Sequence, residues 1–170
     1  MTKDNKETRN DMLAQIDKYG WFSQGVFDPD GESPDFRYSI GMSKTLGSPE
    51  FIVIGLSLEL MHNMLWEVFR QVSSGKLVED GAHLSDLLEG FDCVCKQVHP
   101  SHFDSEYFFG LIAYWNRDFE PETRDIYQIV WPGALSGDFP WDDACDPDII
   151  EQQPHLWLPA ERTKSPAMGS

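Results

Sequence analysis

Carboxylates and tryptophans gather in the C-terminal part of this 170-residue chain. Asp142, Asp143 and Asp146 follow Trp141, and Trp131 precedes it. Loops that carry aromatic rings beside acids form recognition sites, because the rings bury apolar area and the carboxylates attract cations. Acidic side chains are also the usual components of a solvated surface. The residues alone support both interpretations: a solvated acidic surface, and a binding face toward which a basic partner is steered at long range.

A second group of polar residues suggests a different kind of site. Glu50 and Gln128, together with the loop Trp131–Trp141, would line a cleft in a small enzyme or a small-molecule-binding domain. A deep apolar pocket that holds buried ionisable groups would favour this alternative over a protein-binding face.

Cysteine and histidine are spaced in a way that resembles a metal site only loosely. Cys93, Cys95, His99 and His102 form the pattern C-x-C-x3-H-x2-H, whereas structural zinc sites normally begin with C-x2–4-C. Cys93 and Cys95 would lie about 6–7 Å apart on one face of a strand, and only a sharp turn at Pro100 would bring the histidines near them. We therefore expect buried thiols and surface imidazoles, with no metal and no cofactor.

Nucleophilic catalysis would require Ser39 or Ser57 to act with His62 and an acid such as Glu50. The chain has no G-x-S-x-G nucleophile elbow, and Ser57 is better explained as a helix cap. It also has no Walker loop and no G-x-G-x-x-G. The sequence therefore assigns no catalytic residue and points away from an enzyme.

Composition limits the class of protein. The chain has 29 acidic and 13 basic residues, a net charge of −16, and 41% hydrophobic residues. Its length fits one domain, and its apolar content excludes disorder for most of the chain. The negative charge argues against binding to nucleic acid or to an anionic membrane. The absence of an apolar leader and the odd number of cysteines, 3, favour reduced thiols and a cytoplasmic location.

The hydrophobic patterns predict the elements that position these residues. After a flexible lead over residues 1–10, a short helix begins at Asn10 or Asp11 and ends at Gly20, and residues 21–42 form a hairpin around a Pro-Gly turn. Residues 51–54 form a strand in the middle of a sheet. Ser57 then caps the longest helix, whose inner face carries a periodic apolar stripe.

The second half of the chain is predicted to contain shorter elements. Residues 83–89 form a short helix, 91–96 a half-buried strand, 104–115 a second helix and 126–131 another strand. A Pro- and Trp-rich segment then wraps the surface without regular structure, up to residue 159, and residues 160–170 form a flexible tail. The fold class is α+β: a single compact domain over residues 11–159, with a mainly antiparallel sheet packed by two or three helices.

Several of these segments resemble the bacterial family known as domain of unknown function 4262. The resemblance covers residues from about 11 to 158 and rests on the segments Tyr19–Trp21, Phe36–Met42, Ser48–Val53, Gln128–Pro132 and Gly137–Trp141. The chain has Ser39, Met42, Ser48 and Gly133 where the family usually has Thr, Leu, His and Asp. The resemblance implies this fold in a cytosolic bacterial or phage setting, and it implies no catalytic residue.

Charge, aromatic loops and the absence of a catalytic motif lead to one functional hypothesis. The protein is expected to be an interaction module, of an immunity or inhibitor type, that binds a basic protein partner. The alternative is the enzyme or ligand-binding cleft near Glu50 and Gln128. The sequence does not specify an oligomeric state.

Overall fold

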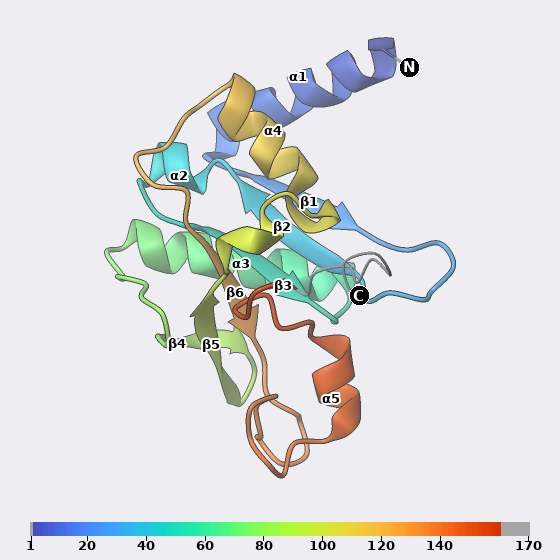
Figure 1. Cartoon of the computed structure of the whole chain (residues 1–170). Coiled ribbons are helices and arrows are strands. Elements are labelled where there is room, and N and C mark those ends of the chain that lie inside the picture. Colours follow the sequence, from blue (N-terminus) through green and yellow to red (C-terminus); the bar gives the residue numbers. More distant parts are fainter. Residues whose placement is uncertain (1, 161–170) are drawn as a thin grey trace, which may run out of the picture.

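A six-stranded sheet forms the centre of the computed structural model, which describes residues 2–160 and the side chains from residue 7 onward. The strands are β1 Phe22–Val26, β2 Phe36–Ile40, β3 Glu50–Ile54, β4 His83–Leu88, β5 Phe91–Gln97 and β6 Ile126–Val130. Their order in the sheet is β1-β2-β3-β6-β5-β4 (Figure 1). The predicted flexible tail, apart from Ala160, lies outside the described residues.

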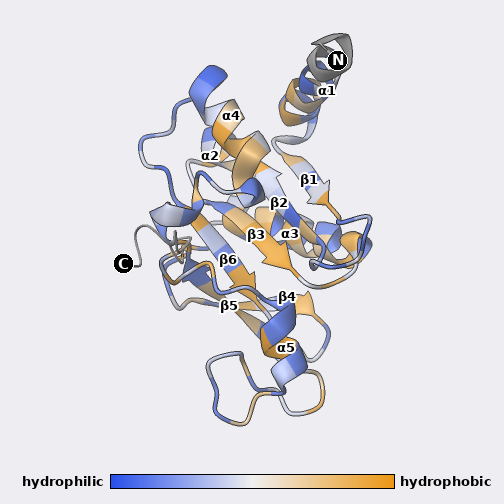
Figure 2. Cartoon of the chain, turned by 45° about the vertical axis from the view of Figure 1, so that its right-hand side comes forward, coloured by the Kyte–Doolittle hydropathy of each residue, from blue (hydrophilic) through white to orange (hydrophobic). Residues whose placement is uncertain are grey.

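The sheet is mixed but mainly antiparallel, because every neighbouring pair except β3 and β6 runs antiparallel. Two antiparallel units, β1-β2-β3 and β4-β5-β6, therefore meet at one parallel junction. Both strands of this junction are buried along their whole length, as the apolar run of residues 51–54 predicts. Figure 2 shows β3 as predominantly hydrophobic. The predicted α+β class is confirmed.

Helices cover both faces of the sheet. In the view of Figure 1, α4 (Phe109–Arg117) lies in front of the sheet and α3 (Leu58–Ser73) lies behind it. One hydrophobic cluster joins α3 to its face of the sheet; the other joins α1 (Thr2–Tyr19), α4 and Leu156 to the opposite face. The core is thus two apolar layers separated by the sheet.

The predicted helix after Ser57 is confirmed as α3, but it is not the longest helix, because α1 has 18 residues and α3 has 16. The Ser57 side chain accepts a hydrogen bond from the backbone of Leu60 and caps α3. Met61, Leu65 and Val68 are fully buried, as their helical spacing predicts. This helix therefore holds one whole layer of the core.

The prediction of a helix over residues 83–89 is wrong, because this segment is strand β4. Leu84 and Leu87 both face the core, a spacing that suggests a helix. In the structure a break in the strand register falls between Leu84 and Leu88, and Asp86 adopts a φ of 66°. This irregularity turns both leucines to the same face and imitates the helical pattern.

Three other helical segments also differ from the prediction. Helix α1 begins at Thr2 rather than at Asn10 or Asp11. The C-terminal wrap, predicted to be irregular, contains α5 (Pro147–Gln152), which Asp146 caps and Pro147 begins. The second predicted helix is divided into a 3-10 turn, Glu106–Phe108, and α4. The short helix α2 (Met42–Thr45) and a 3-10 turn, Pro100–His102, complete the described elements.

Candidate functional site

Glu50 is completely buried at the start of β3 and accepts hydrogen bonds from five donors. The donors are the hydroxyls of Ser39 and Ser43, both at 2.7 Å, and the backbone N–H groups of Gly41, Met42 and Ser43, at 2.9–3.1 Å. Gly41 has a φ of 113°, which lets the chain turn from β2 into α2 and aim these N–H groups at the carboxylate. Glu50 thus closes the turn between two neighbouring strands.

The hydroxyl groups around Glu50 have defined roles. Ser43 Oγ accepts a hydrogen bond from Trp115 Nε1 at 3.0 Å, and Ser39 Oγ accepts one from the backbone of Phe51 at 2.9 Å. Each hydroxyl therefore donates its own proton to Glu50. Burial raises the pKa of the Glu50 carboxyl above its ordinary value, and the hydrogen bonds, which favour the ionised form, offset only part of this rise.

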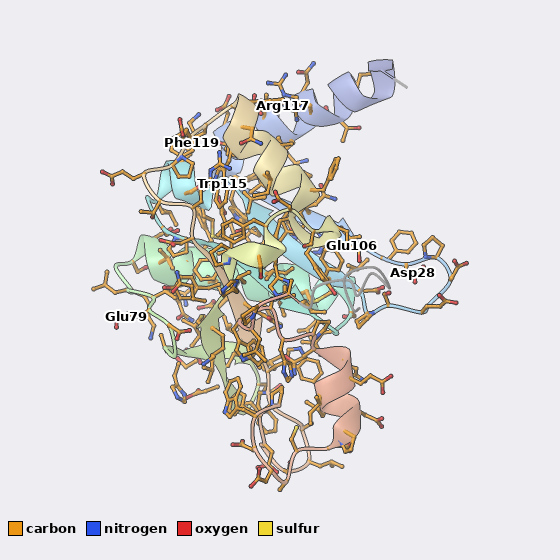
Figure 3. All side chains as sticks on the ribbon, in the orientation of Figure 1. Asp28, Glu79, Glu106, Trp115, Arg117 and Phe119 are labelled. Atoms are coloured by element: carbon orange, nitrogen blue, oxygen red, sulfur yellow. The ribbon has the colours of Figure 1, made fainter. Side chains whose placement is uncertain are left out.

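This arrangement ties helices α4 and α2 to the sheet. Trp115, labelled in Figure 3, reaches from α4 to Ser43 in α2, and Glu50 connects that pair to the sheet. Every donor around the carboxylate belongs to the protein's own framework. The geometry of Glu50 is therefore that of a structural anchor, with no face directed to solvent.

Gln128 and Trp131 are also engaged in internal contacts. The Gln128 amide donates to the carbonyl of Pro154 at 2.9 Å and accepts from the backbone of Leu156 at 3.0 Å. Trp131 is 4% exposed, and its indole N–H donates to the carbonyl of Ile54 at 2.7 Å. Both side chains fasten chain segments to the sheet. Glu50, Gln128 and Trp131 therefore do not line the common cleft that the sequence suggested.

The other predicted site residues lie together on the surface. Trp141 is 43% exposed, Asp143 and Asp146 are exposed, and Asp142 is half-buried. The Trp141 ring stacks on Phe139 with a centroid distance of 5.1 Å and meets the edge of Trp157 at 5.7 Å. We call this surface the acidic-aromatic patch; its residues are Phe139, Trp141, Asp142, Asp143, Asp146 and Trp157.

Backbone contacts hold the patch in shape. The Asp142 carboxylate accepts a hydrogen bond from the backbone of Phe139 at 2.8 Å, and Asp146 accepts one from Asp148 at the start of α5. His155 stacks on Trp157 at 4.4 Å, and burial lowers the pKa of its imidazole. The Lys96 ammonium group of β5 lies 5.4 Å from the centroid of the Trp141 ring. The patch thus combines an aromatic surface, free carboxylate oxygens and a bound cationic side chain.

The cysteine and histidine pattern forms no cluster in the described part of the chain, where no three His, Cys, Asp or Glu side chains come close enough to hold a metal ion. Cys93 and Cys95 are buried in β5, and burial raises the pKa of each thiol to about 12. His99 instead bonds to Ser101, and His102 bonds to the carbonyl of Leu158. No helix within residues 2–160 combines the length and the apolar character that crossing a membrane requires.

The predicted site residues do not include Arg37, Trp21 or Trp66, and the two tryptophans were expected only to seal an edge of the sheet. The structure places all three around a hollow beside His62. The sequence signal that could have identified the site was Arg37 itself, a charged residue in the second position of the otherwise uncharged strand Phe36–Ile40. A charged side chain in such a strand points either to solvent or into a binding site. The sequence does not distinguish these two possibilities, because the answer depends on how α3 packs against the strand.

Comparison with known proteins gives one match. A family model described as a domain of unknown function (DUF4262) matches residues 15–146. No curated protein and no solved structure matches the chain. The matched range includes Glu50, Gln128 and most of the acidic-aromatic patch, but it ends before Trp157.

Proposed function

The chain belongs to the DUF4262 family, and we propose that it is a protein-interaction module that binds a basic segment of a partner at the acidic-aromatic patch. The observation that carries this proposal is the position of the Lys96 ammonium group, 5.4 Å from the centroid of the exposed Trp141 ring. Aromatic faces attract ammonium and guanidinium groups at this distance. A lysine or arginine of a partner would take the place of Lys96.

The surroundings of Trp141 favour such an exchange. Asp143 and Asp146 are exposed beside the ring, so they remain available to pair with a partner's cations. The stack with Phe139 and the edge contact with Trp157 hold the indole in place before binding. A preorganised ring loses little conformational freedom on association, which favours affinity.

The charge of the whole chain supports the same conclusion. A net charge of −16 attracts a basic partner over long distances and speeds its association at low salt. A module of this kind would cover a cationic surface of its partner, in the manner of an immunity or inhibitor protein. The three free cysteines are consistent with a reducing cytosol, which the proposal takes as its setting.

The experiment measures association of a labelled oligolysine peptide by stopped flow at low and high salt. Replacing Asp142, Asp143 and Asp146 with Asn should slow association and flatten its salt dependence, because rim charges act mainly on the encounter rate. Asn still accepts the backbone hydrogen bonds at Asp142 and Asp146. Trp141→Ala should instead speed dissociation.

A charge-matched control separates the patch from the net charge. Glu106→Gln, Glu120→Gln and Glu122→Gln, combined in one variant, remove the same charge from exposed positions outside the patch; Glu106 is labelled in Figure 3. This control should retain most of the association rate. Equal losses in both triple variants, or an unchanged dissociation rate in Trp141→Ala, would show that the patch is solubilising surface only.

A further inference from the structure

A separate hollow of about 520 Å³ lies between the end of α1, strand β1 and helix α3. Its lining residues are Gln15, Tyr19, Trp21, Phe22, Ser23, Arg37, His62 and Trp66. Tyr19 and Trp66 are 46% and 37% exposed and form the rim, whereas Trp21 is buried. None of these residues belongs to the acidic-aromatic patch. We call this hollow the Arg37 pocket.

Arg37 is the only charged residue among those that line the pocket, and it is held in one position. Its Nε donates to the carbonyl of Leu58 at 3.1 Å, and its Nη1 donates to Ser23 Oγ at 2.9 Å and to the Ser23 carbonyl at 3.4 Å. Within the described part of the chain, Nη2 contacts no acceptor, and no carboxylate pairs with the guanidinium. By contrast, Arg9 and Arg70 both pair with acids.

An unpaired, partly buried guanidinium is unexpected in a chain with 29 acidic residues and 13 basic ones, because buried charges are usually paired. Burial of the Arg37 side chain lowers its pKa, and no neighbouring carboxylate opposes this shift. Two donor protons of Nη2 thus remain free for an anion.

Gly25 provides the space for this guanidinium. It is the direct partner of Arg37 across the β1-β2 pair. A Cβ atom at Gly25 would lie 2.8 Å from Nη2 and 2.9 Å from Cζ of Arg37. The missing side chain therefore lets the guanidinium lie across strand β1.

Aromatic rings form the rest of the pocket. Trp21 meets Trp66 edge to face at 5.2 Å and stacks with His62 at 6.1 Å. Trp21 Nε1 and His62 Nδ1 are buried and have no hydrogen-bond partner in the described residues. Burial and the neighbouring Arg37 charge lower the pKa of His62, which keeps its imidazole neutral. The pocket thus offers aromatic walls and one cation, and two unpaired polar atoms lie buried behind those walls.

We propose that the Arg37 pocket binds a small aromatic carboxylate, with its ring against Trp21 and Trp66 and its carboxylate on Nη2 of Arg37. A single cation with one free nitrogen balances a single negative charge. A doubly charged phosphate would need further donors, and it would also meet stronger repulsion from the acidic chain. This site is independent of the proposed protein partner, so either proposal can fail without the other.

The experiment compares indole-3-acetate with its neutral analogue indole-3-acetamide by isothermal titration calorimetry. Wild-type protein should bind the acid about 10- to 100-fold more tightly than the amide, since a hydrogen bond to a charged group has about this effect. Arg37→Gln should abolish that preference. Gly25→Ala should reduce it while the charge stays in place, because the new Cβ displaces only the flexible end of Arg37.

Two further variants complete the design. Trp66→Ala should weaken binding of both probes but retain the preference for the acid. Arg117→Gln removes the same charge from an exposed position on α4, labelled in Figure 3, and should change neither affinity. The proposal is overturned by equal affinities for acid and amide, by no saturable binding of indole-3-acetate, or by tighter binding of phenyl phosphate. An unchanged preference in a folded Gly25→Ala protein would contradict the assigned role of Nη2.

Discussion

Glu50 and the aspartates of the acidic-aromatic patch show how differently one chain can use a carboxylate. Glu50 has no exposed surface and accepts five hydrogen bonds from its own chain. Asp142 and Asp146 each accept a backbone hydrogen bond and keep oxygen atoms toward solvent. A carboxylate whose lone pairs are filled internally stabilises the fold, whereas one with free lone pairs can receive a partner. The number of internal donors therefore distinguishes the two regions.

The largest effect is expected for Glu50→Gln. Its amide NH2 group would face the N–H donors that now point at the carboxylate, so buried donors would lose their acceptor. We expect the free energy of unfolding to fall by about 2–5 kcal/mol, because each buried donor left without an acceptor costs about 1–3 kcal/mol. Urea denaturation measures this change. Exposed Glu120→Gln is the control and should stay within about 0.5 kcal/mol.

Ser43→Ala should have the next largest effect. It removes the hydroxyl that donates to Glu50 and accepts from the Trp115 indole, and it leaves that N–H buried without a partner. The expected loss is about 1–3 kcal/mol in the free energy of unfolding. A loss below about 0.5 kcal/mol, as at exposed sites, would contradict the anchoring role of this contact.

The patch should respond weakly in the same assay. The combined change of Asp142, Asp143 and Asp146 to Asn should alter the free energy of unfolding by no more than about 0.5 kcal/mol, because Asn preserves both backbone contacts. Thermal unfolding of the variant beside wild type tests this. A loss comparable to that of Glu50→Gln would make these aspartates structural and remove the contrast between the two regions.

The smallest effect concerns pH. Burial lowers the pKa of His155, so the unfolded chain takes up a proton near pH 6.5 before the folded protein does. This contribution to stability is complete above that pH and is lost as the pH falls toward the folded pKa. Unfolding measured at pH 7 and pH 5.5 should show a smaller pH-dependent loss in His155→Gln than in wild type. Equal losses would mean that His155 is not desolvated against Trp157.

Local patterns predicted much of the fold. The Ser57 cap with its apolar stripe identified α3, and the β-branched run identified the buried strand β3. The prediction of a helix over residues 83–89 failed because the register break near Asp86 gives strand β4 the apolar spacing of a helix. The candidate site was harder to predict. The sequence grouped Glu50 and Gln128 with Trp141, although only Trp141 is exposed.

The sequence by itself determined the acidic charge, the α+β class and the family, because composition, periodicity and short motifs are local properties. Only the tertiary structure decided which polar groups are free. The Glu50 carboxylate accepts hydrogen bonds from the turn between β2 and α2, and the Gln128 amide donates one to the C-terminal segment, so neither group is free to bind a ligand. The Arg37 guanidinium lies across strand β1 because its cross-strand neighbour is a glycine. Each of these outcomes depends on a donor or a gap supplied by residues distant in the chain, and local sequence patterns do not encode such pairings.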